Sequence, residues 1–330
     1  MARGKDRYMT PPRSVPAISV VVCTYNRASL LRRALDSLAL QTLPASQREF
    51  ILVNDGSTDD THAVAVEFAA RTPEFTAIDQ TNAGLGAARN AGWLAARAPL
   101  IAFLDDDAIA PPDWLQKICA AFAAADARLA VLGGPIDPDW ESPPPPWLTP
   151  DLMLWLTIFD LGPEPLTCND RPIFGGANMA FRAAALREVD GFPANLGRRG
   201  TSLLSHEESA IWSGLAARGW TNAYVPQLRV QHFTPSARMT VAWFRRRLFW
   251  EGVSIARREQ WPETMTSARR LWRWLGIGVA RFATGEFLRP LLLPWRWGRE
   301  VRWQTYCAYY FGYLCEIFRR LPEKTKAAAP

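Results

Sequence analysis

Three consecutive aspartates at positions 105–107 are the residues of this chain most able to do chemistry. They follow an apolar run over residues 99–103, which is typical of a buried strand. Carboxylates crowded at the end of a strand repel one another, and a bound cation relieves that repulsion. The alternating oxygens of Asp105 and Asp107 suit a hard divalent ion such as Mg²⁺ or Mn²⁺. A solvated turn before a helix at Asp113 explains the triplet equally well, so the residues alone leave both interpretations open.

Two more polar clusters follow apolar runs that are typical of buried strands. Residues 18–23 lead into Thr-Tyr-Asn-Arg at 24–27, and residues 50–53 lead into Asn-Asp-Gly-Ser at 54–57. In open α/β sheets, ligands bind beyond the carboxyl ends of the strands. The three clusters together therefore predict a nucleotide site, with positions for base, ribose and phosphates along one edge of a sheet.

The elements around these clusters alternate between strand and helix. Apolar residues at helical spacing predict helices over 28–40, 59–71 and 85–97, and a weak strand fits 75–78. The last of these helices carries Arg89 on its first turns, where an anion is favoured. This alternation predicts an α/β fold with a mostly parallel sheet and helices on both faces.

The second half of the chain is less regular. Four prolines at 143–146 exclude a central strand or a helix there, so residues 137–150 are predicted to form a loop over the site. Further elements are predicted as a strand entered through a glycine turn at 175–181, a helix at 206–218 and a strand at 223–225.

Charge divides the chain near residue 236. Residues 238–330 carry 18 Lys and Arg against 7 Asp and Glu, and they contain 8 of the 15 tryptophans. The remainder of the chain carries a net negative charge, so the two parts of the chain are expected to have different functions.

Residues 1–16 are predicted to be a flexible tail. The five cysteines form no C-x-x-C pair, which indicates reduced thiols in a cytosolic setting. The sequence predicts neither a signal peptide nor a membrane-spanning helix.

The order of the polar clusters resembles glycosyltransferase family 2, the inverting enzymes of the GT-A fold. The resemblance covers about residues 17–235 and includes Asn-Ala-Gly-Leu-Gly-Ala-Ala-Arg-Asn-Ala-Gly at 82–92 and Leu-Asp-Asp-Asp at 104–107. It implies a domain of GT-A type over 17–235 and a nucleotide-sugar donor, with UDP expected as the nucleotide. It also implies Mn²⁺ or Mg²⁺ as the cofactor.

The resemblance implies roles for residues in the first half of the chain. Thr24 and Tyr25 would line the base pocket, and Asp55 would accept the N3–H of uracil. Asp105 would lie at the ribose. Arg27 and Arg89 would complete the donor site.

The same resemblance implies the metal ligands. Asp107 would hold the ion on the diphosphate, with Asp105 beside it. His232 is a candidate third ligand because a neutral imidazole suits Mn²⁺. A structural histidine at a strand end is the alternative interpretation.

Two adjacent acids, Glu207 and Glu208, follow Ser205 at a predicted helix start. The resemblance makes Glu208 the general base, with Glu207 as the second candidate. Ser205-x-x-Glu208 also fits a capping box, in which the glutamate closes back on the Ser205 amide. In the context of the other motifs, the interpretation as a base is favoured.

Three residues are expected on the acceptor side. Residues 175–178 resemble the acceptor-side loop of the family, in which Gly176 would allow close backbone approach and Asn178 would bind a sugar hydroxyl. A plain structural turn explains these residues equally well. Arg247 is expected to contact a diphosphate, either of the donor or of a lipid acceptor. A solvated or lipid-facing basic helix is the alternative. The Gln-x-x-Arg-Trp motif of processive synthases is missing, which argues against polysaccharide synthesis by processive transfer.

Residues 236–330 are predicted to form a helical region, with helices at 266–283 and 301–320. Its arginines, tryptophans and the leucines at 291–293 are typical of a segment that lies on an anionic membrane surface. An ordinary helical subdomain is the alternative. The expected location is cytoplasmic and peripheral, on the inner face of the cell membrane. No motif for binding nucleic acid accompanies the basic charge.

The sequence therefore predicts an inverting, metal-dependent glycosyltransferase. It would move a sugar from a nucleotide sugar to a hydroxyl of a glycan or lipid-linked acceptor, in the synthesis of cell-surface polysaccharide or glycolipid. The alternatives are a sugar-1-phosphate nucleotidyltransferase and a non-catalytic, membrane-bound scaffold that binds nucleotide or carbohydrate. The first would require a glycine-rich, basic loop after the first strand, and residues 24–27 do not provide one.

Overall fold

A computed structural model describes residues 15–193, 196–198, 202–258 and 297–327. Its main sheet has eight strands, in the order β3 (Phe75–Asp79), β2 (Arg48–Asn54), β1 (Ile18–Thr24), β4 (Leu100–Leu104), β9 (Asn178–Arg182), β6 (Leu129–Gly133), β10 (Thr221–Tyr224) and β8 (Leu166–Cys168). Strands β1 to β4 pair in parallel, whereas β9 lies antiparallel between β4 and β6. The carboxyl ends of β1, β2 and β4 therefore meet at one edge of the sheet.

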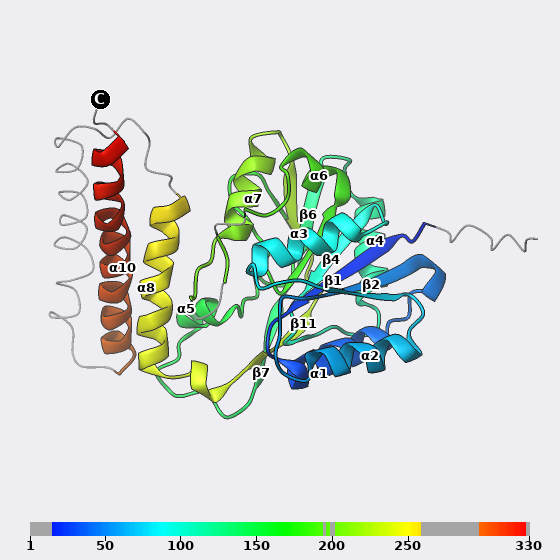
Figure 1. The fold of residues 1–330 in the computed structure, drawn as a ribbon, viewed down its shortest axis with the longest axis horizontal. Coiled ribbons are helices and arrows are strands. Elements are labelled where there is room, and N and C mark those ends of the chain that lie inside the picture. The colour runs from blue at the N-terminus through cyan, green and yellow to red at the C-terminus, as the bar shows by residue number, and fades with distance from the viewer. Residues whose placement is uncertain (1–14, 194–195, 199–201, 259–296, 328–330) are drawn as a thin grey trace, which may run out of the picture.

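Helices cover both faces of this sheet (Figure 1). One face packs against α1 (Ala28–Ala39), α2 (Thr61–Arg71) and α4 (Trp114–Ala124), and the other packs against α3 (Leu85–Ala95), α6 (Ala183–Glu188) and α7 (Glu207–Ala216). Alternate side chains of β1 supply the two cores: Val20 and Val22 face the first layer, and Val21 faces the second. A strand buried on both faces needs apolar residues at every position, which explains its continuous apolar run.

The predicted fold class is confirmed. Every strand and helix predicted between residues 18 and 104 is present, with ends that differ by two residues or fewer. Strand β9 begins after a turn in which the Asn178 amide donates to the Gly175 carbonyl at 3.0 Å, as the glycine pair predicted. All five cysteines are free thiols.

The structure has a second, three-stranded sheet, and one of its strands differs from the sequence prediction. It has the order β5 (Ala108–Ile109), β11 (Val230–Thr234) and β7 (Ile136–Trp140). The prediction of a loop over 137–150 is wrong for its first four residues, which belong to β7. Pro138 is tolerated there because β7 is an edge strand. The small sheet matters for the site because β11 pairs with β5, directly after the aspartate triplet.

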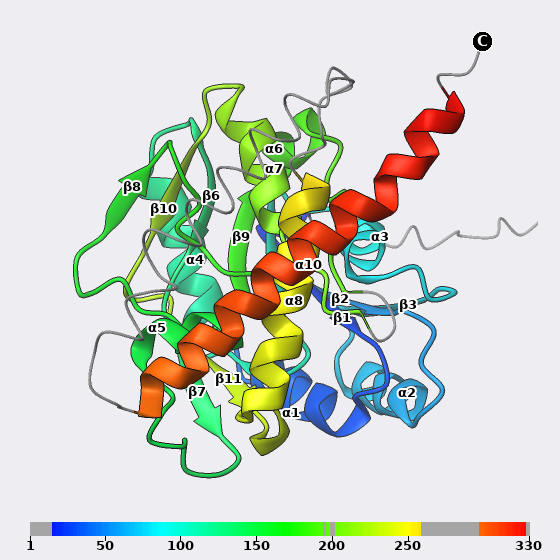
Figure 2. The same cartoon turned by 90° about the vertical axis from the view of Figure 1, so that its left-hand side faces the viewer.

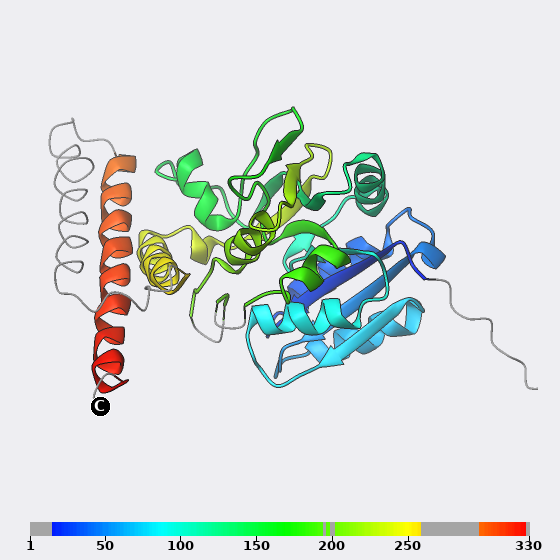
Figure 3. The ribbon, with the colours of Figure 1, turned by 90° about the horizontal axis from the view of Figure 1, so that it is seen from above.

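Two long helices, α8 (Val241–Arg258) and α10 (Trp297–Ala327), pack side by side, with α8 between α10 and the rest of the protein (Figures 2 and 3). They cross at two glycines. A Cβ atom on Gly252 would lie 2.0 Å from the Tyr309 carbonyl oxygen, and one on Gly312 would lie 1.9 Å from that of Phe249. Only glycine permits this approach of the two backbones.

The C-terminal helical segment is confirmed in its last part, because the helix predicted at 301–320 lies within α10. The helix predicted at 266–283 and the leucines at 291–293 lie outside the described residues. Over the described ranges, no helix combines the length and the apolar character that a bilayer crossing needs.

Candidate active site

A cleft of about 830 Å³ opens at the carboxyl ends of β1, β2 and β4. Every residue proposed from the sequence for a site lines it except Asn178: Thr24, Tyr25, Arg27, Asp55, Arg89, Asp105, Asp107, Gly176, Glu207, Glu208, His232 and Arg247. These residues come from both halves of the chain, so the topology of the sheet brings them to one place.

The three candidate metal ligands form one group. Asp105, Asp107 and His232 each offer a ligand atom, and these atoms all lie within 4.8 Å of one another. His232 reaches the triplet because β11 pairs with β5, and its Nε2 atom lies 3.1 Å from Asp107 Oδ1. Two carboxylate oxygens and an imidazole nitrogen are a donor set that suits Mn²⁺. The residues present therefore fit the expected ion.

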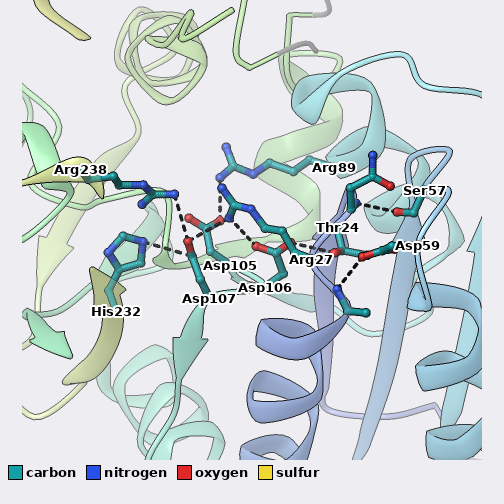
Figure 4. A network of polar contacts seen from close by, with 12 residues as sticks. Thr24, Arg27, Ser57, Asp59, Arg89, Asp105, Asp106, Asp107, His232 and Arg238 are labelled. Carbon is teal, nitrogen blue, oxygen red and sulfur yellow. Dashed lines mark hydrogen bonds and ion pairs between the residues drawn. The ribbon is translucent and has the colours of Figure 1, made fainter. Parts of the chain in front are cut away.

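The triplet is not a solvated turn, because Asp106 and Asp107 are each only 5% exposed. Asp106 faces inward, where its carboxylate accepts from the Thr24 hydroxyl at 2.7 Å and from Arg27 Nη1 at 2.9 Å. Figure 4 shows the same Arg27 nitrogen between Asp106 and Asp107. The middle aspartate is therefore an anchor for Thr24 and Arg27, while its two neighbours are the candidate ligands.

Burial and the neighbouring cations separate the acidities of these two aspartates. Burial raises the pKa of Asp106 to about 6 against the attraction of Arg27. Burial opposes the ionisation of Asp107 too, but His232, Arg27 and Arg238 together hold its pKa well below the usual value. Asp107 is therefore a carboxylate at neutral pH, as a metal ligand must be.

Asp55 stabilises the loop between β3 and α3. Its Oδ1 atom accepts from Gln80 Nε2 at 2.7 Å and from the Ala83 amide at 2.9 Å, and its Oδ2 atom accepts from the Gly84 amide at 2.9 Å. Gly84 has φ 92°, a conformation that favours glycine. The sequence did not predict this structural role, and the contact of Asp55 with a uracil stays a prediction.

Arg89 connects the metal group to the paired glutamates. Its Nη2 atom lies 3.4 Å from Asp105 Oδ1, and its Nη1 atom lies 3.0 Å from Glu208 Oε1 and 3.2 Å from Glu207 Oε1. Burial disfavours its charge, but the three acids raise its pKa above the ordinary value. A single buried cation therefore fixes the distance between the candidate metal ligands and the candidate base.

The capping-box alternative for Ser205 and Glu208 is wrong. The Ser205 amide donates to the Ser254 hydroxyl at 3.0 Å, and its own hydroxyl donates to Glu251 at 2.8 Å. Glu208 turns to Arg89 instead and keeps 21% of its side chain exposed, against 5% for Glu207. Of the two glutamates, Glu208 is therefore better placed to meet a substrate.

Two acceptor-side predictions have different outcomes. The prediction that Asn178 binds a sugar hydroxyl is wrong, because its amide is 1% exposed and bonds to Trp114, Pro135 and Leu228. Gly176 does lie in the cleft, where a Cβ atom would come within 2.1 Å of Glu208 Oε1. The glycine therefore makes room for the candidate base.

Several cleft residues were missed from the sequence. His206 caps α7 with φ 75°, and its Nε2 atom lies 2.6 Å from Glu251 Oε1, whose carboxylate also accepts from Arg247 at 2.8 Å. The spacing of Arg247 and Glu251 by one helical turn was a usable signal. The signal for His206 was absent, because its partner lies 45 residues away. Two further arginines also escaped notice: Arg198 lines the cleft, and Arg238 has its Nη2 atom 3.4 Å from Asp107 Oδ2.

Replacing Glu207 with glutamine should stabilise the protein above pH 7. Burial and the nearby Glu208 raise the pKa of Glu207 from 4.5 to about 7. A carboxyl group whose native pKa is raised loses stability as pH increases between those values. The free energy of unfolding of the variant should therefore exceed that of the wild type by almost nothing below pH 4.5 and by about 1–3 kcal/mol near pH 7, where the difference levels off. Thermal melts across this range check it, and a constant difference would contradict the assignment.

Comparisons with known proteins bear on the family to which the chain belongs. The family model described as "Glycosyl transferase family 2" matches residues 19–190, just over half of the chain. A glucosyl-dolichyl phosphate glucuronosyltransferase from Haloferax volcanii is 28% identical over 250 residues, which cover 72% of this chain and 75% of that protein. A validoxylamine A glucosyltransferase from Streptomyces hygroscopicus subsp. jinggangensis is 41% identical over 121 residues, which cover 36% of this chain and 28% of that protein.

Among solved structures, a mannosyltransferase from Pyrobaculum calidifontis, determined in complex with GDP-Man and Mn²⁺, superposes with a TM-score of 0.61. Its sequence is 19% identical, and the match covers 92% of this chain and 88% of the other. At this identity the likeness establishes the GT-A fold and no more. Together with the family match and the named relatives, the cleft leads to one conclusion: this chain is an enzyme of glycosyltransferase family 2.

Proposed function

We propose that this protein is an inverting, metal-dependent glycosyltransferase that uses a nucleotide sugar, with UDP as the expected nucleotide. The sugar would pass to a hydroxyl of a glycan or lipid-linked acceptor, in the synthesis of cell-surface polysaccharide or glycolipid. The observation that carries this proposal is the bridge of Arg89 between Asp105 and Glu208. This contact supports the proposal, because direct displacement requires a base close to the diphosphate of the donor.

In the proposed mechanism, Glu208 removes the proton from the acceptor hydroxyl. The oxygen attacks the anomeric carbon from the side opposite the nucleotide, so a new glycosidic bond forms as the bond to the diphosphate breaks. Arg27 and Arg238 lie beside Asp107, where they would face the negative charge of the departing diphosphate. Asp105, Asp107 and His232 would hold Mn²⁺ or Mg²⁺, whose chemistry is to neutralise that same charge.

A screen of nucleotide sugars for release of the nucleotide, with Mn²⁺ and with excess EDTA, tests this proposal. We expect release from at least one donor, dependent on the metal and stimulated by an acceptor. The panel should include GDP sugars as well as UDP sugars, because the choice of nucleotide rests on the sequence alone. Release that is unchanged in EDTA, or no release from any donor, would sink the proposal.

We also propose that residues 236–330 hold the enzyme on the cytoplasmic face of a membrane. The support is the excess of basic residues and tryptophan in that segment. The name of the Haloferax relative, which refers to a dolichyl phosphate, supports a lipid-linked acceptor.

Flotation with liposomes checks the membrane proposal. Each arginine near anionic lipid contributes about 1 kcal/mol, so several together should bind anionic vesicles at low salt and release them at high salt. Tryptophans that enter the interface should make the release incomplete. Equal binding to neutral and anionic vesicles would remove the electrostatic part, and no binding to either would leave a plain structural subdomain.

A further inference from the structure

Helix α8 holds the two residues that come directly before the paired glutamates. The Ser205 amide donates to the Ser254 hydroxyl at 3.0 Å, and the Ser205 hydroxyl donates to Glu251 Oε2 at 2.8 Å. The Nε2 atom of His206 lies 2.6 Å from Glu251 Oε1. The family model ends at residue 190, so these contacts come from a part of the chain that it does not cover.

Glu251 accepts hydrogen bonds from three side chains. Its own side chain is only 7% exposed, and Arg247 donates to its Oε2 atom at 2.8 Å in addition to the contacts above. Burial opposes its ionisation, but His206, Arg247 and Ser205 together lower its pKa to about 2. An ionised carboxylate can only accept hydrogen bonds, so the Nε2 atom of His206 carries a proton. Glu251 is therefore a buried anion with both oxygens occupied.

The backbone of His206 needs such a contact, because it is in the left-handed region with φ 75°. This conformation is unfavourable for a residue with a side chain, and it persists where the surrounding structure fixes it. The Nδ1 atom of His206 lies 3.2 Å from Ser209 Oγ on the first turn of α7, while Nε2 faces Glu251. The imidazole therefore joins α8 to the turn of α7 that carries Glu207 and Glu208.

The carboxylate of Glu208 has little room to move. Its Oε1 atom lies 3.0 Å from Arg89 Nη1, and a Cβ atom on Gly176 would come within 2.1 Å of it. Arg89 therefore fixes the tip of the side chain, while the contacts of Ser205 and His206 fix the backbone that carries it. A displacement of about 1 Å at a reacting group can lower a rate about 100-fold. Loss of the backbone contacts should therefore slow the proton transfer.

We propose that Glu251 is a positioning residue of the transfer reaction. By fixing Ser205 and His206, it keeps Glu208 within reach of the acceptor hydroxyl, and it acts on the reaction only through that base. The inference rests on the proposed transferase function and adds α8 to the elements that build the site. The alternative is an ordinary ion pair between Arg247 and Glu251, which are one helical turn apart, with no effect on the base.

Glu251→Gln tests the inference in two backgrounds, the wild type and Glu208→Gln. Glutamine keeps the size of the side chain, but it is neutral and presents a donor in place of one acceptor oxygen. In the wild-type background we expect the turnover of glycosyl transfer, with the donor that the screen identifies, to fall about 10- to 100-fold. In the Glu208→Gln background the further loss should be less than about threefold, because the base through which Glu251 acts is already absent.

Glu316→Gln is the matched control for a purely structural effect. Glu316 is only 3% exposed, and its carboxylate joins α10 to α8 through Arg257 at 3.0 Å. This substitution should lower the melting temperature and leave turnover near that of the wild type. Calorimetric titrations of UDP and of GDP should give wild-type affinities in Glu316→Gln and Glu251→Gln, because Thr24 and Asp55 of the candidate donor site lie at the ends of β1 and β2.

Hydrogen exchange of the amides at 204–209, followed by mass spectrometry, measures the hold of α8 on this segment without any turnover. The exchange should be at least about tenfold faster in Glu251→Gln and unchanged in Glu316→Gln. His206→Asn is a second variant, because asparagine accepts the left-handed backbone but lacks the imidazole. It should lower turnover by a similar factor, and the loss should not add to that of Glu251→Gln, since both break the same contact.

Two results would overturn the inference alone. Turnover near that of the wild type in both Glu251→Gln and His206→Asn would leave only the ordinary ion pair. Equal losses from Glu251→Gln in the wild-type and Glu208→Gln backgrounds would mean a general loss of the active fold. Failure of the transferase proposal is a separate event, seen as a wild type that releases no nucleotide in the donor screen. Faster exchange in Glu251→Gln would then report a contact that stabilises α7 and has no base to position.

Discussion

Replacing Glu208 with glutamine should lower the turnover of glycosyl transfer by at least about 10²-fold, the low end for loss of a general base. The amide has the size of the carboxylate, and its oxygen can still accept from Arg89, which lies 3.0 Å from Glu208 Oε1. It cannot take a proton from the acceptor. Donor binding and melting temperature should therefore change little. Steady-state kinetics with a saturating donor, together with calorimetric titration of the nucleotide, measure both quantities.

Glu207→Gln is the matched control for this experiment. Glu207 lies next to Glu208 in the chain and shares Arg89, but its side chain is only 5% exposed. The control should retain most of the turnover and show its main effect in the stability at high pH. Near-normal turnover in Glu208→Gln with a dead Glu207→Gln would move the base by one residue. Normal turnover in both variants would show that the site is misread.

The half of the fold that could be predicted is the half governed by local patterns. Strands β1, β2 and β4 are buried on both faces, so each appears as a short apolar run that ends in polar residues. The helices between them have apolar residues at helical spacing. Parallel strands joined by helices bring their carboxyl ends to one edge, so a sequence with this rhythm places Thr24, Asp55 and Asp105 together without further information.

The parts that could not be predicted depend on pairing between distant segments. Strand β7 contains Pro138, which argues against a strand unless it is known to lie at an edge. The roles of Asn178 and His206 also depend on contacts between distant segments, so they could not be predicted either. Asn178 looks like a polar residue beside a glycine turn, but its amide bonds to the interior side chain of Trp114 and to two carbonyls. His206 acquires its partner, Glu251, only when α8 packs against the start of α7.

The aspartate triplet shows both effects in three residues. The sequence predicted a cation for Asp105 and Asp107, and the fold adds His232 to the same group. The middle residue was left without a role, and the fold points it inward to Thr24 and Arg27. The triplet forms a turn between β4 and β5, in which the Ala108 amide donates to the Asp105 carbonyl at 3.0 Å, and an apolar run followed by three aspartates does not predict how such a turn directs each side chain.

Asp107→Asn should remove metal-dependent binding of the nucleotide and reduce transfer to background. Asparagine keeps the size of the side chain but supplies a neutral ligand in place of a carboxylate. Calorimetric titration of Mn²⁺, and of UDP with and without Mn²⁺, checks this without any need for turnover. The substitution should also lower stability at neutral pH. His232, Arg27 and Arg238 hold the pKa of Asp107 well below 3.8, so its charge stabilises the native state above that pH and the benefit is lost as pH falls.

Asp106→Asn is the control, because Asp106 lies in the same triplet but outside the group that could bind the ion. Its carboxylate contacts Thr24 and Arg27, and burial raises its pKa to about 6. A neutral side chain at this position therefore changes the charge of the site less than one at position 107 does. This variant should still titrate Mn²⁺ with an affinity close to that of the wild type. His232→Ala should weaken Mn²⁺ without abolishing its binding, since two carboxylates remain. Full transfer by Asp107→Asn, or by the wild type in excess EDTA, would mean that Arg27 and Arg238 alone neutralise the departing diphosphate, and the enzyme would then need no metal.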